Sequence, residues 1–83
     1  MADIKEKIGK SENTEFNTAL GRRVKEKRLE LKWSREKLAE RSRLSDKFIY
    51  DIEVGNKGMT AWTMSKVAKA LGVSGDWLMW GDY

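Results

Sequence analysis

Apolar residues recur every three or four positions through most of this chain, a spacing typical of helices that bury one face. The clearest run covers residues 16–32, where Phe16, Leu20, Val24 and Leu31 form the predicted inward face with Arg and Lys dense between them. The sequence contains no proline, no internal repeat and no pattern of a strand. We therefore predict an all-α chain of five helices.

Hydroxyl residues mark the predicted starts of the four helices that follow. A Ser or Thr ahead of an apolar-periodic run caps the first turn, because its side-chain oxygen accepts a backbone N–H there. A glycine just past the last periodic residue is the usual helix end. The predicted starts are Ser34, Ser45, Thr60 and Ser74, and the predicted glycine end is Gly72.

The second and third helices are predicted to form a helix-turn-helix. The residues between them, 41–44, are too few for anything but a turn, so the third helix must leave at a steep angle. Ala39 is small and lets the two backbones approach closely. In this geometry the later helix can stand out from the body and enter a DNA major groove.

Arg28 continues the inward stripe of the first long helix, four residues beyond Val24. A charge at the edge of a core is costly unless it is paired. Glu53, at the end of the third helix, is the predicted partner in a structural ion pair. The alternative is that Arg28 extends into solvent and Glu53 is an ordinary surface carboxylate.

The composition excludes some classes of function but does not identify the function. The 83 residues predict one small domain, and the 17 Lys and Arg against 13 Asp and Glu give a net charge of +4. The surplus lies in residues 1–43, which suits a polyanion partner but is also common in proteins that have none.

The absence of Cys and His removes disulfides, thiolate metal sites and the commonest general base. The carboxylates, lysines and tyrosines form no catalytic constellation, so we expect no enzyme, no metal and no cofactor. No apolar run approaches the roughly 18 residues of a membrane span, and the N-terminus lacks the apolar stretch of a signal peptide. We expect a cytoplasmic chain without a membrane partner. Residues 1–15 are predicted to be a flexible arm and residues 16–83 the folded domain.

The chain from Leu20 to Gly81 resembles the DNA-binding domain of the Cro and lambda-repressor type, also called XRE-type. The order and spacing of four short motifs together carry the resemblance, whereas each motif alone is weak. They are Leu38-Ala39, Leu44-Ser45, Ile52 to Gly55 and the run from Val67 to Ser74. The resemblance implies a compact five-helix bundle whose third helix reads the major groove, usually as a homodimer on a palindromic operator. It also implies the pair of Arg28 with Glu53.

The function expected from this resemblance is that of a sequence-specific regulator of transcription, phage-repressor-like, which binds double-stranded DNA. Such a regulator would be encoded by a bacterium or phage and associate with the nucleoid. The expected base-reading residues are Ser45, Asp46, Lys47, Tyr50 and Asp51. The expected phosphate-binding residues are Arg22, Arg23, Arg35, Arg43, Asn56 and Lys57.

Three of these positions have open alternatives. Lys47 can donate to guanine, and Asp46 or Asp51 can accept from a cytosine amino group. Equally, Asp46 can simply stabilise the helix N-terminus, while Asp51 is solvated or pairs with Lys47 four residues away. Arg43 stands where the family prefers Gly. Either the turn opens there, or Arg43 takes a positive φ at a cost of order 1 kcal/mol.

The four tryptophans suggest a second surface. Trp33 is expected in the core. Trp77 either closes the core or faces a second subunit, and with Trp62 and Trp80 it is a candidate for a dimer contact or for the docking surface of a missing C-terminal domain. The ending WGDY is typical of the point where such repressors begin a linker. With the acidic residues on the reading helix, these tryptophans also motivate an alternative function. That alternative is a protein-interaction module, such as an antitoxin, with weak or lost DNA binding.

Overall fold

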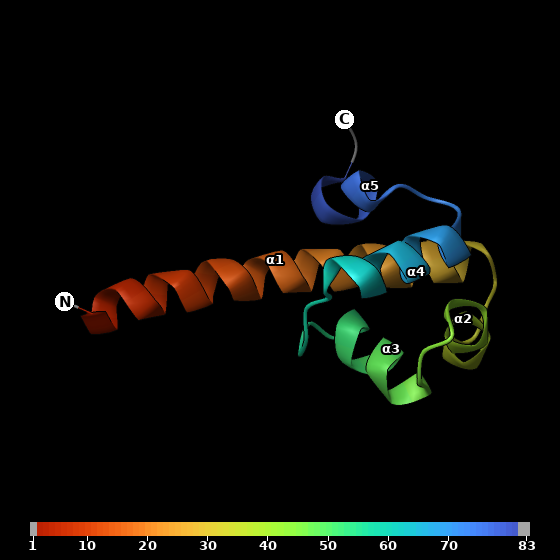
Figure 1. The fold of residues 1–83 in the computed structure, drawn as a ribbon, viewed down its shortest axis with the longest axis horizontal. Helices are drawn as coiled ribbons and strands as arrows, with labels where there is room; N and C mark the ends of the chain where they lie inside the picture. The colour runs from red at the N-terminus through yellow and green to blue at the C-terminus, as the bar shows by residue number, and fades with distance from the viewer. Residues whose placement is uncertain (1, 82–83) are drawn as a thin grey trace.

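The computed structural model describes the backbone of residues 2–81 and the side chains of residues 14–81. Within that range the chain folds into five helices and no strand, which confirms the all-α prediction with the helix-turn-helix at the second and third helices (Figure 1). The helices are α1 (Ala2–Glu30), α2 (Arg35–Ser42), α3 (Asp46–Glu53), α4 (Ala61–Leu71) and α5 (Gly75–Trp80).

Helix α1 is the long element against which α3, α4 and α5 pack. Figure 1 shows α3 on one side of it and α5 on the other, with α4 overlapping it in this view, and α1 is in contact with all three. The backbone of α1 is helical from Ala2 with no break near residue 15, the predicted boundary between arm and domain. The side chains of residues 1–13 lie outside the described part of the chain, so the flexibility of that arm stays a prediction.

The core forms where the inward faces of the five helices meet. Phe16 is half-buried against this core, but Leu31 is 37% exposed. The inward face predicted for residues 16–32 is therefore wrong at Leu31. The reason is that α1 ends at Glu30 and the chain turns away at Lys32, which has a φ of 61°. The fully buried apolar side chains are Leu20, Val24, Leu38, Ile49, Ile52, Val67 and Leu78.

Gly21 lies where α1 and α3 approach most closely. A Cβ added at Gly21 would overlap the backbone oxygen of Ile52 and lie 3.0 Å from the backbone oxygen of Glu53. The end of α3 can therefore rest on α1 only because position 21 has no side chain. No pattern in the sequence singled out this glycine.

The four short helices begin at the predicted residues. The side-chain oxygens of Ser34, Ser45, Thr60 and Ser74 each accept the backbone N–H three residues further on, at 3.0–3.1 Å. Each such cap is worth about 1 kcal/mol. Gly72 ends α4 in the left-handed conformation, with a φ of 73°, as its position predicted.

The turn between α2 and α3 resolves the two alternatives for Arg43. The residue adopts the left-handed conformation, with φ 59° and ψ 43°, and the turn stays closed. The N–H of Leu44 donates to the carbonyl of Ala39 at 2.9 Å, which satisfies one of the last carbonyls of α2. The tight turn is thus kept without glycine, and it directs α3 away from α2.

Candidate nucleic-acid interface

Helix α3 lies along the edge of the molecule opposite α5 (Figure 1). Its exposed residues are Asp46, Lys47 and Tyr50, and Val54, which directly follows the helix as its C-cap, is exposed as well. We call these four residues the reading face. The opposite side of α3 is buried in the core. A solvent-facing surface is thus anchored by apolar contacts at its back. Val54, which is 43% exposed, was not among the predicted contacts.

Glu53 joins the three helices that support this surface. Its side chain is 0% exposed, and its Oε2 accepts from Arg28 Nε at 2.6 Å. Its Oε1 accepts from Arg28 Nη2 at 3.1 Å and from Arg35 Nε at 2.9 Å. The carbonyl of Trp33 takes a further hydrogen bond from Arg28 at 2.7 Å. The pair of Arg28 with Glu53 is therefore present as predicted, and Arg35 is an additional member that the sequence did not indicate.

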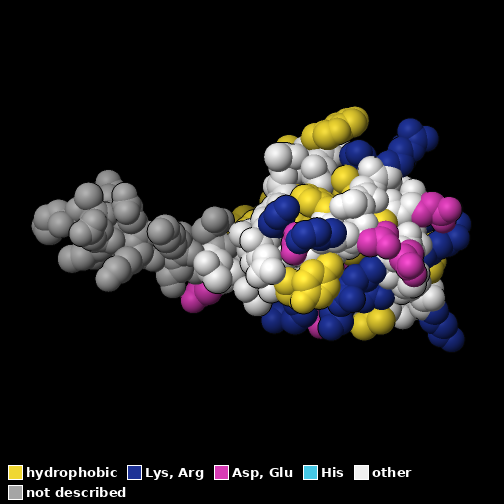
Figure 2. All heavy atoms as spheres, turned by 90° about the horizontal axis from the view of Figure 1, so that it is seen from below, with side chains coloured by type: hydrophobic (Ala, Val, Ile, Leu, Met, Phe, Trp, Pro, Cys, Tyr) yellow, Lys and Arg dark blue, Asp and Glu magenta, His cyan; other side chains and the backbone are white. Residues whose placement is uncertain are grey.

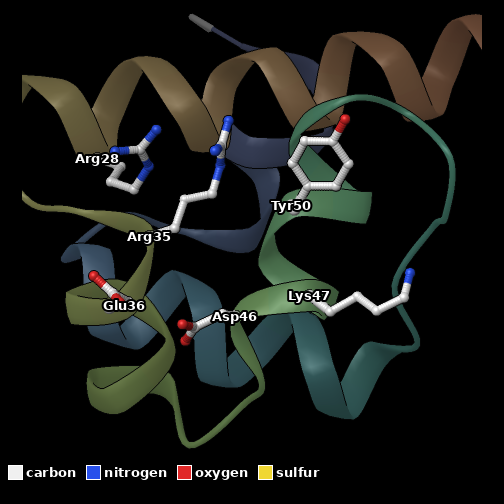
Figure 3. A pocket seen from close by; sticks show the side chains of 6 residues that line it. All are labelled: Arg28, Arg35, Glu36, Asp46, Lys47 and Tyr50. Carbon is white, nitrogen blue, oxygen red and sulfur yellow. The ribbon is translucent and has the colours of Figure 1, made fainter.

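Arg35 is held in one orientation at the first position of α2. Its guanidinium carbon lies 5.0 Å from the ring centroid of Tyr50, so the cation rests against the aromatic face. Figure 3 shows these two side chains extending in the same direction. Among the described residues, the one hydrogen bond that this guanidinium donates runs from its Nε–H to Glu53. The two Nη groups remain available for an anion.

An open hollow of about 510 Å³ separates α2 from the reading face. In Figure 3 the Asp46 carboxylate points toward α2 and the Lys47 side chain extends the other way. The hollow therefore carries both acidic and basic side chains. Its lining residues are Arg28, Arg35, Glu36, Asp46, Lys47 and Tyr50.

Asp51 is not on the reading face. Its residue exposure is 4%, and its carboxylate lies 3.1 Å from Lys47 Nζ and 3.6 Å from Lys57 Nζ. The base-reading role predicted for Asp51 does not fit this placement, because the segment after α3 folds back on this end of the helix and the carboxylate is buried there. The alternative pairing with Lys47 is the one observed. The hydrogen bond from Lys47 and the charges of Lys47 and Lys57 lower the pKa of Asp51 below 3.8, against the opposing effect of burial.

This pairing predicts a pH dependence of stability. The pKa of Asp51 is lowered in the folded state. The contribution of the Asp51 carboxylate to the unfolding free energy is therefore fully present above pH 3.8, and it is lost as the pH falls through the folded-state pKa. The difference in unfolding free energy between the wild type and Asp51→Asn should therefore shrink in the acid range. Denaturant titrations over a pH series measure it. In a Lys47→Ala background the pH-dependent part should be smaller. A difference that is constant with pH contradicts the assignment.

The segment after α3 folds back on the end of that helix. The backbone N–H groups of Asn56 and Lys57 donate to the carbonyl of Asp51 at 2.9 and 3.3 Å. Lys57 Nζ also lies 5.8 Å from the ring centroid of Phe48. Both side chains are exposed, so this segment presents an amide and an ammonium group beside the reading face.

Comparison with known proteins decides the family. Residues 21–83 match a family model described as a helix-turn-helix domain. The chain belongs to the XRE-type helix-turn-helix family. Among solved structures it is similar to the crystal structure of the restriction-modification controller protein C.AhdI from Aeromonas hydrophila. The two share 27% identity over 75% of this chain and 94% of that chain, with a TM-score of 0.72. No curated protein matches the chain.

The resemblance to XRE-type domains is therefore confirmed, and this helix-turn-helix protein is a DNA-binding transcription regulator. Figure 2 looks at the molecule from the α3 side and shows Lys and Arg side chains over much of this face, with Asp and Glu side chains gathered toward one side. In the part of the chain that the structure describes, no helix is both long and apolar enough to cross a membrane.

Two arginines predicted to bind phosphate occupy other places in the helix-turn-helix protein. Arg23 Nη1 donates to the carbonyls of Leu78 at 3.0 Å and Met79 at 2.9 Å, so it holds α5 against α1. The phosphate role predicted for Arg23 does not fit, because α5 and α3 lie on opposite sides of α1 (Figure 1). Arg43 is exposed and faces a hollow shared with α4. The third predicted arginine of this helix-turn-helix protein, Arg22, is exposed, and its Nε lies 4.0 Å from Glu26 Oε2.

The tryptophans of the helix-turn-helix protein divide into two groups. Trp33 and Trp77 are half-buried and pack against the core, which matches the prediction for Trp33 and the core alternative for Trp77. Trp62 is 73% exposed and Trp80 is 61% exposed. The ring of Trp80 meets that of Phe16 edge-on with centroids 5.4 Å apart, and Trp62 lies on a different helix, α4. Trp62 lines a hollow between α2 and α4 that neither Trp77 nor Trp80 lines, and the contact predicted for the three tryptophans stays a prediction.

Proposed function

We propose that this protein binds specific sequences of double-stranded DNA as a homodimer, with α3 in the major groove, and regulates transcription from those sites. The observation that supports this most is the reading face, whose side chains are exposed while the other side of α3 is buried. The major groove of B-DNA is about 12 Å wide and admits one helix. The similarity of this chain to a restriction-modification controller protein supports a role in transcription control.

Base recognition is assigned to the reading face together with Ser45. Lys47 donates to guanine, Asp46 accepts from a cytosine amino group, and Val54 contacts a thymine methyl group. Tyr50 and the Ser45 hydroxyl add hydrogen bonds, although the Ser45 oxygen also caps α3. Asp51 acts through Lys47, whose ammonium group it holds at 3.1 Å.

Phosphate binding is assigned to residues that flank the reading face. Arg35 is the best oriented, because Glu53 and Tyr50 hold its guanidinium while the Nη groups stay free among the described residues. Asn56 and Lys57 lie on the other flank, and Arg22 supplies a further exposed cation from α1. Such contacts set the position of the protein on the duplex without reading its sequence.

Two substitutions separate these roles. Lys47→Ala should cost about 1–3 kcal/mol on a site selected by the wild type and much less on random duplex. Arg35→Ala should weaken binding to both duplexes alike. The slope of log affinity against log salt concentration should fall by the amount expected for about one phosphate contact. Fluorescence anisotropy at several salt concentrations measures both effects.

Lys69→Ala is the control for these measurements, because Lys69 is an exposed cation on α4 that contributes to neither role. Equal losses on both duplexes for Lys47→Ala would contradict base reading. A loss confined to the selected site for Arg35→Ala would contradict phosphate binding.

An apolar hollow of about 430 Å³ between α1, α4 and α5 is the proposed dimer contact. Phe16, Met59 and Met79 line it, and no charged side chain does among the described residues. A twofold axis through this hollow brings no like charges together among its lining residues, and a palindromic operator requires such an axis. Exposed Trp80 rests on Phe16 at its edge.

Trp80→Ala should weaken dimerisation at least about tenfold, because buried aromatic residues dominate such contacts. Sedimentation equilibrium measures the change in dimer dissociation constant. Trp62→Ala is the matched control, since it removes an exposed indole from a different helix, α4, and it should leave the constant unchanged. A larger effect for Trp62→Ala than for Trp80→Ala would contradict the proposed dimer contact.

A further inference from the structure

A second hollow, of about 570 Å³, lies between the end of α2 and the outer side of α4. We call it the basic hollow. None of its lining residues in the described part of the chain comes from α3 or from the segment after it, so it is separate from the reading face. The residues that give it its character are Arg41, Arg43, Trp62, Lys66 and Lys69.

The charge of the basic hollow is uncompensated. Its four cations line one space, and within the described residues none lies within 4.0 Å of a carboxylate oxygen. Other cations of this chain, such as Lys47 and Lys57, do have such partners. Cations gathered without counter-charges produce a positive potential that attracts an anionic group.

Trp62 adds an apolar surface to this charge. Its side chain is 73% exposed at the start of α4, and Lys66 Nζ lies 5.7 Å from its ring centroid. The cation covers one region of the indole and leaves most of it in water. Tryptophan and arginine are the residue types most enriched among those that dominate binding energy in protein interfaces. Their presence together outside the DNA surface indicates a protein contact.

We propose that the basic hollow docks an acidic segment of a partner protein, one that also carries a large apolar side chain. Carboxylates of the segment pair with Lys66 and Lys69. They also pair with Arg41 and Arg43, whose planar guanidinium groups bind carboxylates through two parallel hydrogen bonds. The apolar side chain packs on the open part of the Trp62 ring. The hollow falls within the range of roughly 300–1,000 Å³ that ligand pockets occupy, and it is large enough for such a side chain.

Two other occupants fit less well. A second copy of this chain related by a twofold axis would place the four cations against the same four cations, which is repulsive. A DNA duplex would satisfy the charge but offers Trp62 no unstacked base. Because the basic hollow and the reading face share no residue, this proposal does not depend on the proposed function.

The test is an NMR titration of the whole protein with a 12-residue synthetic peptide of Asp and Glu that carries two Phe residues. The indole N–H signal of Trp62, identified by its loss in Trp62→Phe, should shift together with the backbone amides of α4. The signal of Trp77, which does not line the basic hollow, should stay in place. Trp62→Ala and the double variant Lys66→Gln, Lys69→Gln should each weaken peptide binding at least tenfold. The matched control Lys25→Gln, Lys32→Gln removes two charges elsewhere and should change it less than twofold.

Operator binding provides a second readout, since the variants of the basic hollow should retain wild-type affinity for DNA. The proposal is overturned if the peptide does not bind, or if it shifts the amides of α3 in place of those of α4. Equal weakening in the control double variant also overturns it, because binding would then follow net charge. Displacement of the peptide from Trp62 by a single-stranded oligonucleotide of tighter affinity would assign the hollow to nucleic acid.

Discussion

Glu53→Gln is expected to lower the free energy of unfolding by about 3–5 kcal/mol. The substitution keeps the shape of the side chain but removes the carboxylate that two arginines share, at 2.6 Å from Arg28 and 2.9 Å from Arg35. Arg28 is only 6% exposed, so its charge would be left buried without a counter-charge. A domain of this size typically has a stability of about 5–15 kcal/mol, and the loss would be a large part of it.

Thermal and denaturant unfolding measure this effect, and the melting temperature should fall by at least about 12 °C. Glu40→Gln is the control, because the side chain of Glu40 is 73% exposed and its partner Lys37 is 3.7 Å away. That exposed pair should contribute less than about 1 kcal/mol. If Glu53→Gln remained within 1 kcal/mol of the wild type, Glu53 would not hold the three helices together.

Gly21→Ala should destabilise the fold by about 1–3 kcal/mol, even though alanine favours helix formation by about 1 kcal/mol. The added methyl group would overlap the backbone oxygen of Ile52, and a backbone atom cannot rotate away as a side chain can. The end of α3 would have to move off α1. We therefore expect DNA affinity to fall along with stability.

Gly75→Ala is the matched comparison. The nearest atom to its added Cβ is the Met64 sulfur at 3.7 Å, an ordinary contact. This substitution at the first position of α5 should leave stability unchanged or slightly raised. Chemical denaturation of both variants, with DNA affinity measured on each, separates the two sites. Similar stabilities for the two variants would show that the contact of α1 with α3 tolerates a side chain.

The features that the sequence predicted well are those set by neighbouring residues. A capping hydroxyl needs only the N–H three positions on, so Ser34, Ser45, Thr60 and Ser74 could be identified from the chain alone. The tight turn at Arg43 followed from the small number of residues between the helices. The positive φ there was one of two alternatives, and only the structure distinguished them.

The features that the sequence missed depend on packing between distant segments. Arg35 reaches Glu53 across 18 positions, and Arg23 reaches Leu78 across 55, and no spacing rule connects them. The two aspartates of α3 show the same limit within one helix. Both were candidates for base reading, but Asp46 is exposed while Asp51 is buried. The segment after α3 folds back toward Asp51, which the helical period alone does not reveal.

Selection of bound DNA from a random duplex pool tests the central claim, that the exposed face of α3 reads base sequence. The wild-type chain should enrich one motif made of two inverted half-sites, with centres about 10–10.5 base pairs apart or a multiple of that spacing. Selection with Lys47→Ala should lose preference at one position of each half-site and keep the same spacing. A pool that stays random after repeated rounds, or a motif unchanged by Lys47→Ala, would contradict the account.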